Sequence, residues 1–149
     1  MYRKILVPID GSKTAGLGLR EAIKLSQALK ATLRLLYVVN ETDIVMAEAA
    51  YPNAELLNQL QQVGRKILDD AERDVRAAGL SAESVLLNSS TQVAGELIVQ
   101  QAKDWPCDLI VMGTHGRHGL SKLVLGSTAE FVLHHTPVPV LLERSQHAR

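Results

Sequence analysis

The chain has 149 residues, enough for one domain with a substantial core, and 46% apolar and 21% charged residues indicate a globular rather than a disordered protein. Its sixteen basic and sixteen acidic residues cancel, and it has only five aromatic residues, which argues against a nucleic-acid partner. It has no apolar run of about 18 residues, its start (MYRKILVPIDGS) is unlike a signal peptide, and it has one cysteine, so we expect a cytoplasmic protein without membrane insertion.

Apolar runs and helically spaced segments alternate along the chain. A buried strand is predicted over 4–9, a helix over 14–30 and a strand over 31–39, followed by a stretch without a clear period over 40–54. A helix over 54–78 ends at Gly79, and the remaining elements are a strand (81–88), a helix (91–103), a strand (107–113), a helix (127–135) and a strand (137–143). Such alternation predicts a single α/β domain, 1–149, with a doubly wound five-stranded parallel sheet in the order 3-2-1-4-5 and helices on both faces.

The topology indicates where a ligand would bind. In open α/β sheets ligands bind beyond the carboxyl ends of the strands, where the strand order reverses. Asp10 follows the first strand, and the sequence GTHGRHGLSKLVLGST (113–128, the glycine segment) follows the fourth. We therefore expect Asp10 and the glycine segment to face each other across one crevice, although an aspartate at a strand end can also serve only as a turn former.

The glycine segment has the composition of a phosphate site. Gly113 and Gly116 permit positive φ and close backbone approach, while Gly126 precedes a helix whose first N–H groups are unpaired. The Ser127 and Thr128 hydroxyls add donors at this helix N-terminus, where anions bind favourably. Three basic side chains of the segment would add positive charge: Arg117, His118 and Lys122. The alternative is that these glycines serve only as turn and cap residues.

Other candidate sites are weaker. The P-loop pattern fails because Ser12 separates Gly11 from Lys13, and the dinucleotide fingerprint fails because Glu21 stands where its third glycine belongs. His134 and His135 end a helix and point in different directions, so we expect a helix-end role rather than a metal site. Cys107 is expected to be a small buried residue.

The chain resembles the universal stress protein family. The pattern Gly-x2-Gly-x9-Gly-[Ser/Thr], formed by Gly113, Gly116, Gly126 and Ser127, is similar to the family's nucleotide-binding motif. Further segments that match the family extend the resemblance over essentially the whole chain: ILVPIDGS, LLYVV, DLIVMGTHGR and LGSTAEFVLHHTPVPVLL. Family members with this motif bind ATP, so the resemblance implies ATP as the ligand, with Mg²⁺ accompanying it.

The resemblance also implies a role for individual residues. Asp10 would meet the ribose or the phosphates, with Pro8 and Ile9 beside it. Val39 would offer backbone groups to the adenine edge, and Met112 would pack near the base and ribose. The phosphate-side residues would be Gly113, His115 and Gly116 around the ribose and first phosphates, and Gly126, Ser127 and Thr128 along the phosphate tail.

The same resemblance implies a homodimer, formed by antiparallel pairing of the last strand, Val138 to Leu142. Because no residue that would activate a water is evident, we expect a nucleotide-dependent stress-response or regulatory module rather than an enzyme. Two alternatives stay open: a slow ATPase or nucleotidyl-transferring enzyme, and an ATP-sensing regulator of a transporter. Residues 40–54 would form a lid or a partner surface.

Overall fold

The computed structural model describes residues 1–41, 54–90, 92–115 and 125–144, and within these ranges five strands alternate with four helices. All strand pairs are parallel, and the order β3-β2-β1-β4-β5 is the predicted one. The strands are β1 (Lys4–Pro8), β2 (Thr32–Asn40), β3 (Ala82–Ser89), β4 (Leu109–Gly113) and β5 (Val140–Glu143). The helices are α1 (Lys13–Leu29), α3 (Ala54–Ala77), α4 (Ala94–Asp104) and α5 (Ser127–His135).

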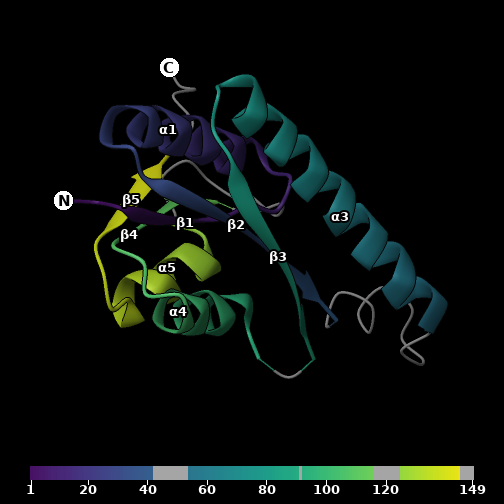
Figure 1. Ribbon diagram of the computed structural model, residues 1–149. Coiled ribbons are helices and arrows are strands. Elements are labelled where there is room, and N and C mark those ends of the chain that lie inside the picture. The colour runs from purple at the N-terminus through teal and green to yellow at the C-terminus, as the bar shows by residue number, and fades with distance from the viewer. Residues whose placement is uncertain (42–53, 91, 116–124, 145–149) are drawn as a thin grey trace, which may run out of the picture.

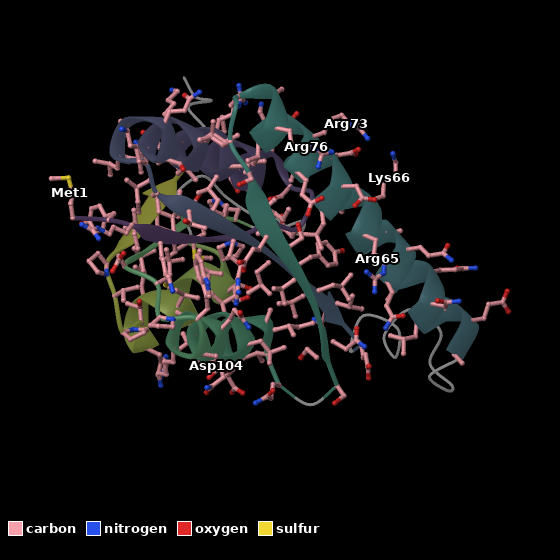
Figure 2. All side chains as sticks on the ribbon, viewed as in Figure 1. Met1, Arg65, Lys66, Arg73, Arg76 and Asp104 are labelled. Atoms are coloured by element: carbon pink, nitrogen blue, oxygen red, sulfur yellow. The ribbon has the colours of Figure 1, made fainter. Side chains whose placement is uncertain are left out.

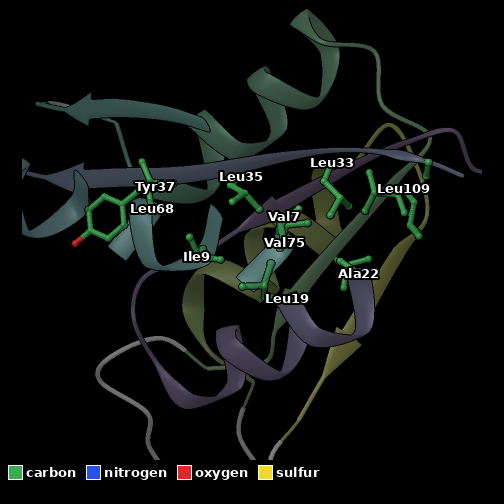
Figure 3. Close-up of a cluster of buried hydrophobic side chains, with 14 of the residues drawn as sticks. Val7, Ile9, Leu19, Ala22, Leu33, Leu35, Tyr37, Leu68, Val75 and Leu109 are labelled. Atoms are coloured by element: carbon green, nitrogen blue, oxygen red, sulfur yellow. The ribbon is translucent and has the colours of Figure 1, made fainter. Parts of the chain in front are cut away.

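The sheet is the middle of three layers (Figure 1). Helices α1 and α3 cover one face, and α4 and α5 cover the other, so each face has its own apolar core. Figure 3 shows the first core, in which Val7 and Leu35 of the sheet meet Leu19 of α1 and Val75 of α3. Because helices cover both faces of the sheet, side chains on both sides of β1 and β4 are buried, and these strands are continuous apolar runs in the sequence.

Single side chains shift the strand boundaries from the predicted ones. The last strand begins at Val140 rather than at residue 137, because Pro137 and Pro139 have no N–H to give to a ladder. The fourth strand begins at Leu109, two residues later than predicted. Asp108 before it still bonds the start of β1: its N–H donates to the Lys4 carbonyl (2.8 Å), and its Oδ2 accepts from the backbone N–H groups of Arg3 (2.7 Å) and Lys4 (2.9 Å).

Two helix ends use left-handed backbone. Gly79 follows α3 with φ +80°, as predicted for a helix-terminating glycine. Lys30 ends α1 with φ +55°, a conformation that is costly for a residue with a Cβ and was therefore not predicted. The Ser26 hydroxyl donates to the Ala31 carbonyl and helps to hold this turn.

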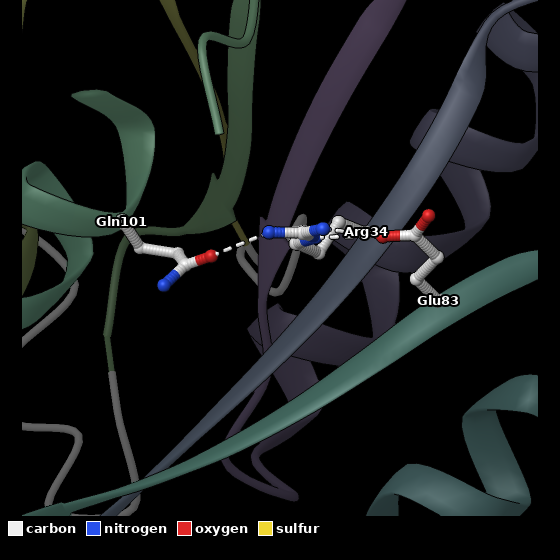
Figure 4. A network of polar contacts seen from close by, with 3 residues as sticks. All are labelled: Arg34, Glu83 and Gln101. Atoms are coloured by element: carbon white, nitrogen blue, oxygen red, sulfur yellow. Dashed lines mark hydrogen bonds and ion pairs between the residues drawn. The ribbon is translucent and has the colours of Figure 1, made fainter. Parts of the chain in front are cut away.

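Polar contacts support the sheet away from the predicted ligand edge. Arg34 of β2 donates to Gln101 Oε1 of α4 (2.8 Å) and to Glu83 of β3 (Figure 4). Its guanidinium also lies 4.5 Å from the centre of the Trp105 ring.

The outer side of α3 carries charged side chains that include Lys66 (Figure 2), which pairs with Asp70 at 3.8 Å.

Candidate functional site

The carboxyl ends of β1 and β4 lie side by side, as the predicted strand order requires. Pro8 and Ile9 are buried at the end of β1, and Met112 is buried at the end of β4. Helices α1 and α4 cover opposite faces of the sheet, so the strand order reverses between β1 and β4. The described part of the chain therefore has its topological switch point where it was predicted.

Asp10 forms the turn between β1 and α1. Its Oδ1 accepts a hydrogen bond from the Ser12 N–H (2.8 Å), and Gly11 between them has φ +83°. Asp10 thus forms the turn, and because the residue is only half-buried its carboxylate can also meet a ligand. Ser12 caps α1, accepting from the Ala15 N–H at 3.2 Å.

Ser12 joins this turn to the glycine segment. Its hydroxyl donates to the His115 carbonyl at 3.3 Å, across 103 positions of sequence. Asp10 and the start of the glycine segment are thus bridged by one residue, Ser12. The structure brings these two parts of the predicted site together.

Gly113 is required for helix packing rather than for a turn. A Cβ on this residue would lie 2.5 Å from Thr14 Oγ1 and 2.7 Å from the Ala15 nitrogen, so α1 lies directly against the end of β4. The expectation of close backbone approach is correct, although the approaching group is α1. The expectation of positive φ is wrong for Gly113, because the residue is the last of β4 and has extended backbone.

Thr14 of α1 holds the backbone of His115. The Thr14 hydroxyl donates to the His115 carbonyl (2.5 Å) and accepts from the His115 N–H (3.3 Å). The imidazole Nδ1 lies 3.0 Å from Thr114 Oγ1. Sequence reasoning did not assign Ser12, Thr14 or Thr114 to the site. The signal for Ser12 and Thr14 was that two hydroxyl residues closely follow Asp10, and that for Thr114 was its place inside the glycine segment.

The second end of the glycine segment lies next to the first. The Gly126 N–H donates to the Thr114 carbonyl at 2.8 Å, and the Thr114 N–H donates to the Glu143 carbonyl of β5 at 2.9 Å. Helix α5 then begins at Ser127, followed by Thr128, and no side-chain hydrogen bond from Gly126 caps it. The predicted phosphate-side residues Gly113, His115, Gly126, Ser127 and Thr128 are therefore gathered at one edge, whereas Gly116 and the basic residues 117, 118 and 122 lie outside the described residues.

The backbone of β2 faces the crevice at Val38 rather than at Val39. Backbone groups of successive strand residues point to opposite sides, and the Leu36 carbonyl accepts from the Ile9 N–H on the β1 side (2.8 Å). Val38 therefore also faces the β1 side, just beyond the end of β1, while Val39 faces β3. The Val39 side chain is buried in the core under α1 and α3. The geometry favours Val38 for the base-edge role that was predicted for Val39.

Other titratable groups behave as structural residues. His135 stacks on Phe131 with ring centres 4.1 Å apart, and its Nδ1 lies 2.9 Å from the Phe131 carbonyl, which supports the helix-end prediction. Burial raises the pKa of the Cys107 thiol. The described ranges contain no group of three or more His, Cys, Asp or Glu side chains arranged to hold a metal ion. None of the helices described is long and apolar enough to cross a membrane.

The chain matches the universal stress protein family over residues 1–144. It is 33% identical to universal stress protein YxiE of Bacillus subtilis, and the alignment covers 97% of this chain and 100% of that protein. The structure of protein MJ0577 of Methanocaldococcus jannaschii superposes with a TM-score of 0.86 at 29% identity, covering 99% of each chain. UspA of Lactobacillus plantarum superposes at 0.81 with 27% identity, covering 96% of this chain and 98% of its own.

Three more distant structures share the fold at 16–20% identity and hold nucleotides. One universal stress protein is in complex with cAMP, that of Archaeoglobus fulgidus with dAMP, and one from Arabidopsis thaliana with AMP. Three findings lead to the same family: the order of the strands, the hydrogen bond that joins the two ends of the glycine segment, and the family match over residues 1–144. The chain belongs to the universal stress protein family.

Proposed function

We propose that this protein binds ATP at the carboxyl edge of its sheet and acts as a nucleotide-dependent regulatory module in the stress response. The observation that carries the proposal is the N-terminus of α5. Its N-cap residue is Gly126, which has no side chain to cap the helix and whose N–H donates to the Thr114 carbonyl just after β4. A helix N-terminus of this kind attracts phosphate through its free N–H groups and its dipole. The complexes of distant family members with AMP, dAMP and cAMP support an adenine nucleotide as the class of ligand.

Each half of the edge suits a different part of the nucleotide. The phosphate tail would lie along Gly126, Ser127 and Thr128, with the residues that end β4 alongside. The adenine would take backbone hydrogen bonds from Val38, in place of Val39, with Met112 below it. Val38 and Met112 belong to the same core cluster and hence to the same face of the sheet.

Asp10 suits the ribose and the metal ion that accompanies the phosphates. Its half-buried carboxylate lies between the buried Pro8 and Ile9 on one side and Ser12 on the other. Carboxylate and phosphate oxygens are the ligands that Mg²⁺ prefers. When bound, Mg²⁺ would neutralise phosphate charge, and Asp10 would hold it from the protein side.

The proposal includes a cytoplasmic homodimer formed through β5. The Pro139 carbonyl accepts from Ile110 of β4, and the Glu143 carbonyl accepts from Thr114 just after β4. The alternating backbone therefore turns Val140 and Leu142 toward the outer edge of the sheet. An apolar edge strand with free backbone groups is a ready surface for pairing with a second copy.

The test is direct binding by protein that has been purified without added nucleotide. Denaturation should release adenine nucleotide, and calorimetry with Mg-ATP should give saturable binding to the emptied protein. The variant Asp10→Asn should bind more weakly. Asp108→Asn is its matched control, because Asp108 also accepts backbone hydrogen bonds but lies at the opposite end of the sheet. Absence of both released and titrated nucleotide in the wild type would show the proposal to be wrong.

The same preparation tests the enzymatic alternatives. Sustained phosphate release that Asp10→Asn abolishes and Asp108→Asn leaves intact would indicate an ATPase. Binding without turnover is the result expected for a regulatory module. Co-purification of a membrane transporter that ATP releases would favour the transporter regulator.

A further inference from the structure

Thr14 is a buried hydroxyl residue whose contacts extend beyond its own helix. It is the second residue of α1 and is 7% exposed. Its Oγ1 satisfies both backbone groups of His115, donating to the carbonyl (2.5 Å) and accepting from the N–H (3.3 Å). We propose that Thr14 is a positioning residue that sets how strongly the site binds the phosphate groups of its nucleotide, an inference that rests on the proposed function.

The contact matters because it lies next to both described ends of the glycine segment. His115 follows Thr114, whose carbonyl accepts from the Gly126 N–H (2.8 Å) at the start of α5. A change in where His115 is held therefore alters the relative position of β4 and the first turn of α5. Phosphate recognition by N–H groups depends on distances of about 2.7–3.2 Å, so small displacements weaken it.

Two residues near the start of α1, Ser12 and Thr14, reach the backbone of His115. Gly113 presents no side chain toward α1, and a Cβ there would lie 2.5 Å from Thr14 Oγ1. The Ser12 hydroxyl reaches the His115 carbonyl only at 3.3 Å. The Thr14 hydroxyl satisfies both the carbonyl and the N–H of His115, whereas the Ser12 hydroxyl donates to the carbonyl.

Thr14 also connects the two halves of the proposed site. Asp10 accepts from the Ser12 N–H, and Ser12 and Thr14 both reach His115 from the first turn of α1. The base and ribose end depends on β1 and β2, which Thr14 does not hold through these bonds. Loss of the Thr14 hydroxyl should therefore weaken binding of the phosphates and spare that of the nucleoside.

The experiment compares adenosine and Mg-ATP binding by calorimetry in four full-length proteins. Thr14→Val keeps the shape and removes the hydroxyl, and Thr14→Ser restores the hydroxyl. Ser26→Ala is the matched control, because Ser26 is a buried residue of the same helix whose hydroxyl donates to the Ala31 carbonyl at the far end. The measured quantity is the ratio of the adenosine Kd to the ATP Kd, which a general loss of stability does not change.

In Thr14→Val this ratio should fall by about five- to tenfold, the equivalent of one hydrogen bond, through weaker ATP binding at an unchanged adenosine Kd. Thr14→Ser and Ser26→Ala should keep the wild-type ratio. A wild-type ratio in Thr14→Val, or equal losses for both ligands, would overturn this inference while leaving the proposed function intact. A wild-type protein that binds no ATP would instead overturn the proposed function and this inference with it.

Discussion

Replacement of Gly126 by aspartate should make α5 more stable and ATP binding weaker. Gly126 has φ −63° and ψ 151°, backbone that any L-residue adopts, and it occupies the N-cap position without a side-chain hydrogen bond. Aspartate is a favoured N-cap that accepts from the N–H groups of the first turn, which gains a few tenths of a kcal/mol over glycine. Its charge at the positive end of the helix dipole adds about 0.3–1 kcal/mol.

The same carboxylate occupies the N–H groups that the phosphates are proposed to use and adds a like charge beside them. Two unit charges about 4 Å apart repel by about 1 kcal/mol in water and about 4 kcal/mol at an effective dielectric constant of 20. The Mg-ATP Kd should therefore rise by at least about fivefold. Adenosine binding should be unchanged, because adenosine has no phosphate.

Urea unfolding and calorimetry with Mg-ATP and adenosine test both halves of this prediction. Gly126→Asn is the control, because it offers a neutral cap of the same size and should weaken ATP binding less than Gly126→Asp does. An aspartate variant that is stabilised but binds ATP as tightly as the wild type would refute phosphate recognition at α5. An aspartate variant less stable than the asparagine variant would refute the assigned cap geometry.

Three further predictions concern the rest of the molecule. Leu142→Pro should convert a dimer to monomers in sedimentation experiments, because it removes an N–H from the outer edge of β5. Leu141→Pro is the control and should instead lower stability, because it breaks the ladder with β4. A dimeric Leu142→Pro protein would exclude this interface. Lys30→Gly should raise the free energy of unfolding by about 0.5–1 kcal/mol, because φ is +55° at this residue. Lys24→Gly within α1 is the control and should lower it by about 1 kcal/mol. Urea titration measures both free energies, and no gain at Lys30 would contradict the assigned conformation. The backbone N–H groups of Arg3 and Lys4 lower the pKa of Asp108. This carboxylate therefore stabilises the fold above its unfolded-state pKa, and the contribution is lost as the pH falls through the folded-state pKa. Asp108→Asn should lose less stability than the wild type below about pH 4, and identical acid unfolding curves would contradict this.

The sequence predicts the strand order because its signals are local and repeated. Apolar runs and helical spacing recur along the chain, and parallel βαβ units leave few possible topologies. The errors occur where one side chain decides a boundary. Pro137 and Pro139 delay the start of β5, and Lys30 adopts a conformation for which asparagine or glycine would have been the expected residue.

The candidate site could be predicted only in part. Asp10 and the glycine segment follow neighbouring strands, so topology alone brings them together. The Thr14 bond to His115 joins residues 101 positions apart, and the choice of Val38 over Val39 depends on which way each backbone group points. Neither leaves a periodic or compositional signal, so both require coordinates.

The glycines of the motif have different physical roles, and mutagenesis of the site has to respect this. Gly113 is the place where α1 packs against β4, and a Cβ there meets backbone atoms of Thr14 and Ala15 at 2.6–2.7 Å. Because backbone cannot move aside as a flexible side chain can, substitution at Gly113 disturbs packing first and binding second. Gly126 has backbone open to other residues and precedes the donors that the phosphates would use. Lost ATP binding at Gly113 would therefore report on the fold, whereas at Gly126, in a protein of undiminished stability, it would report on the site itself.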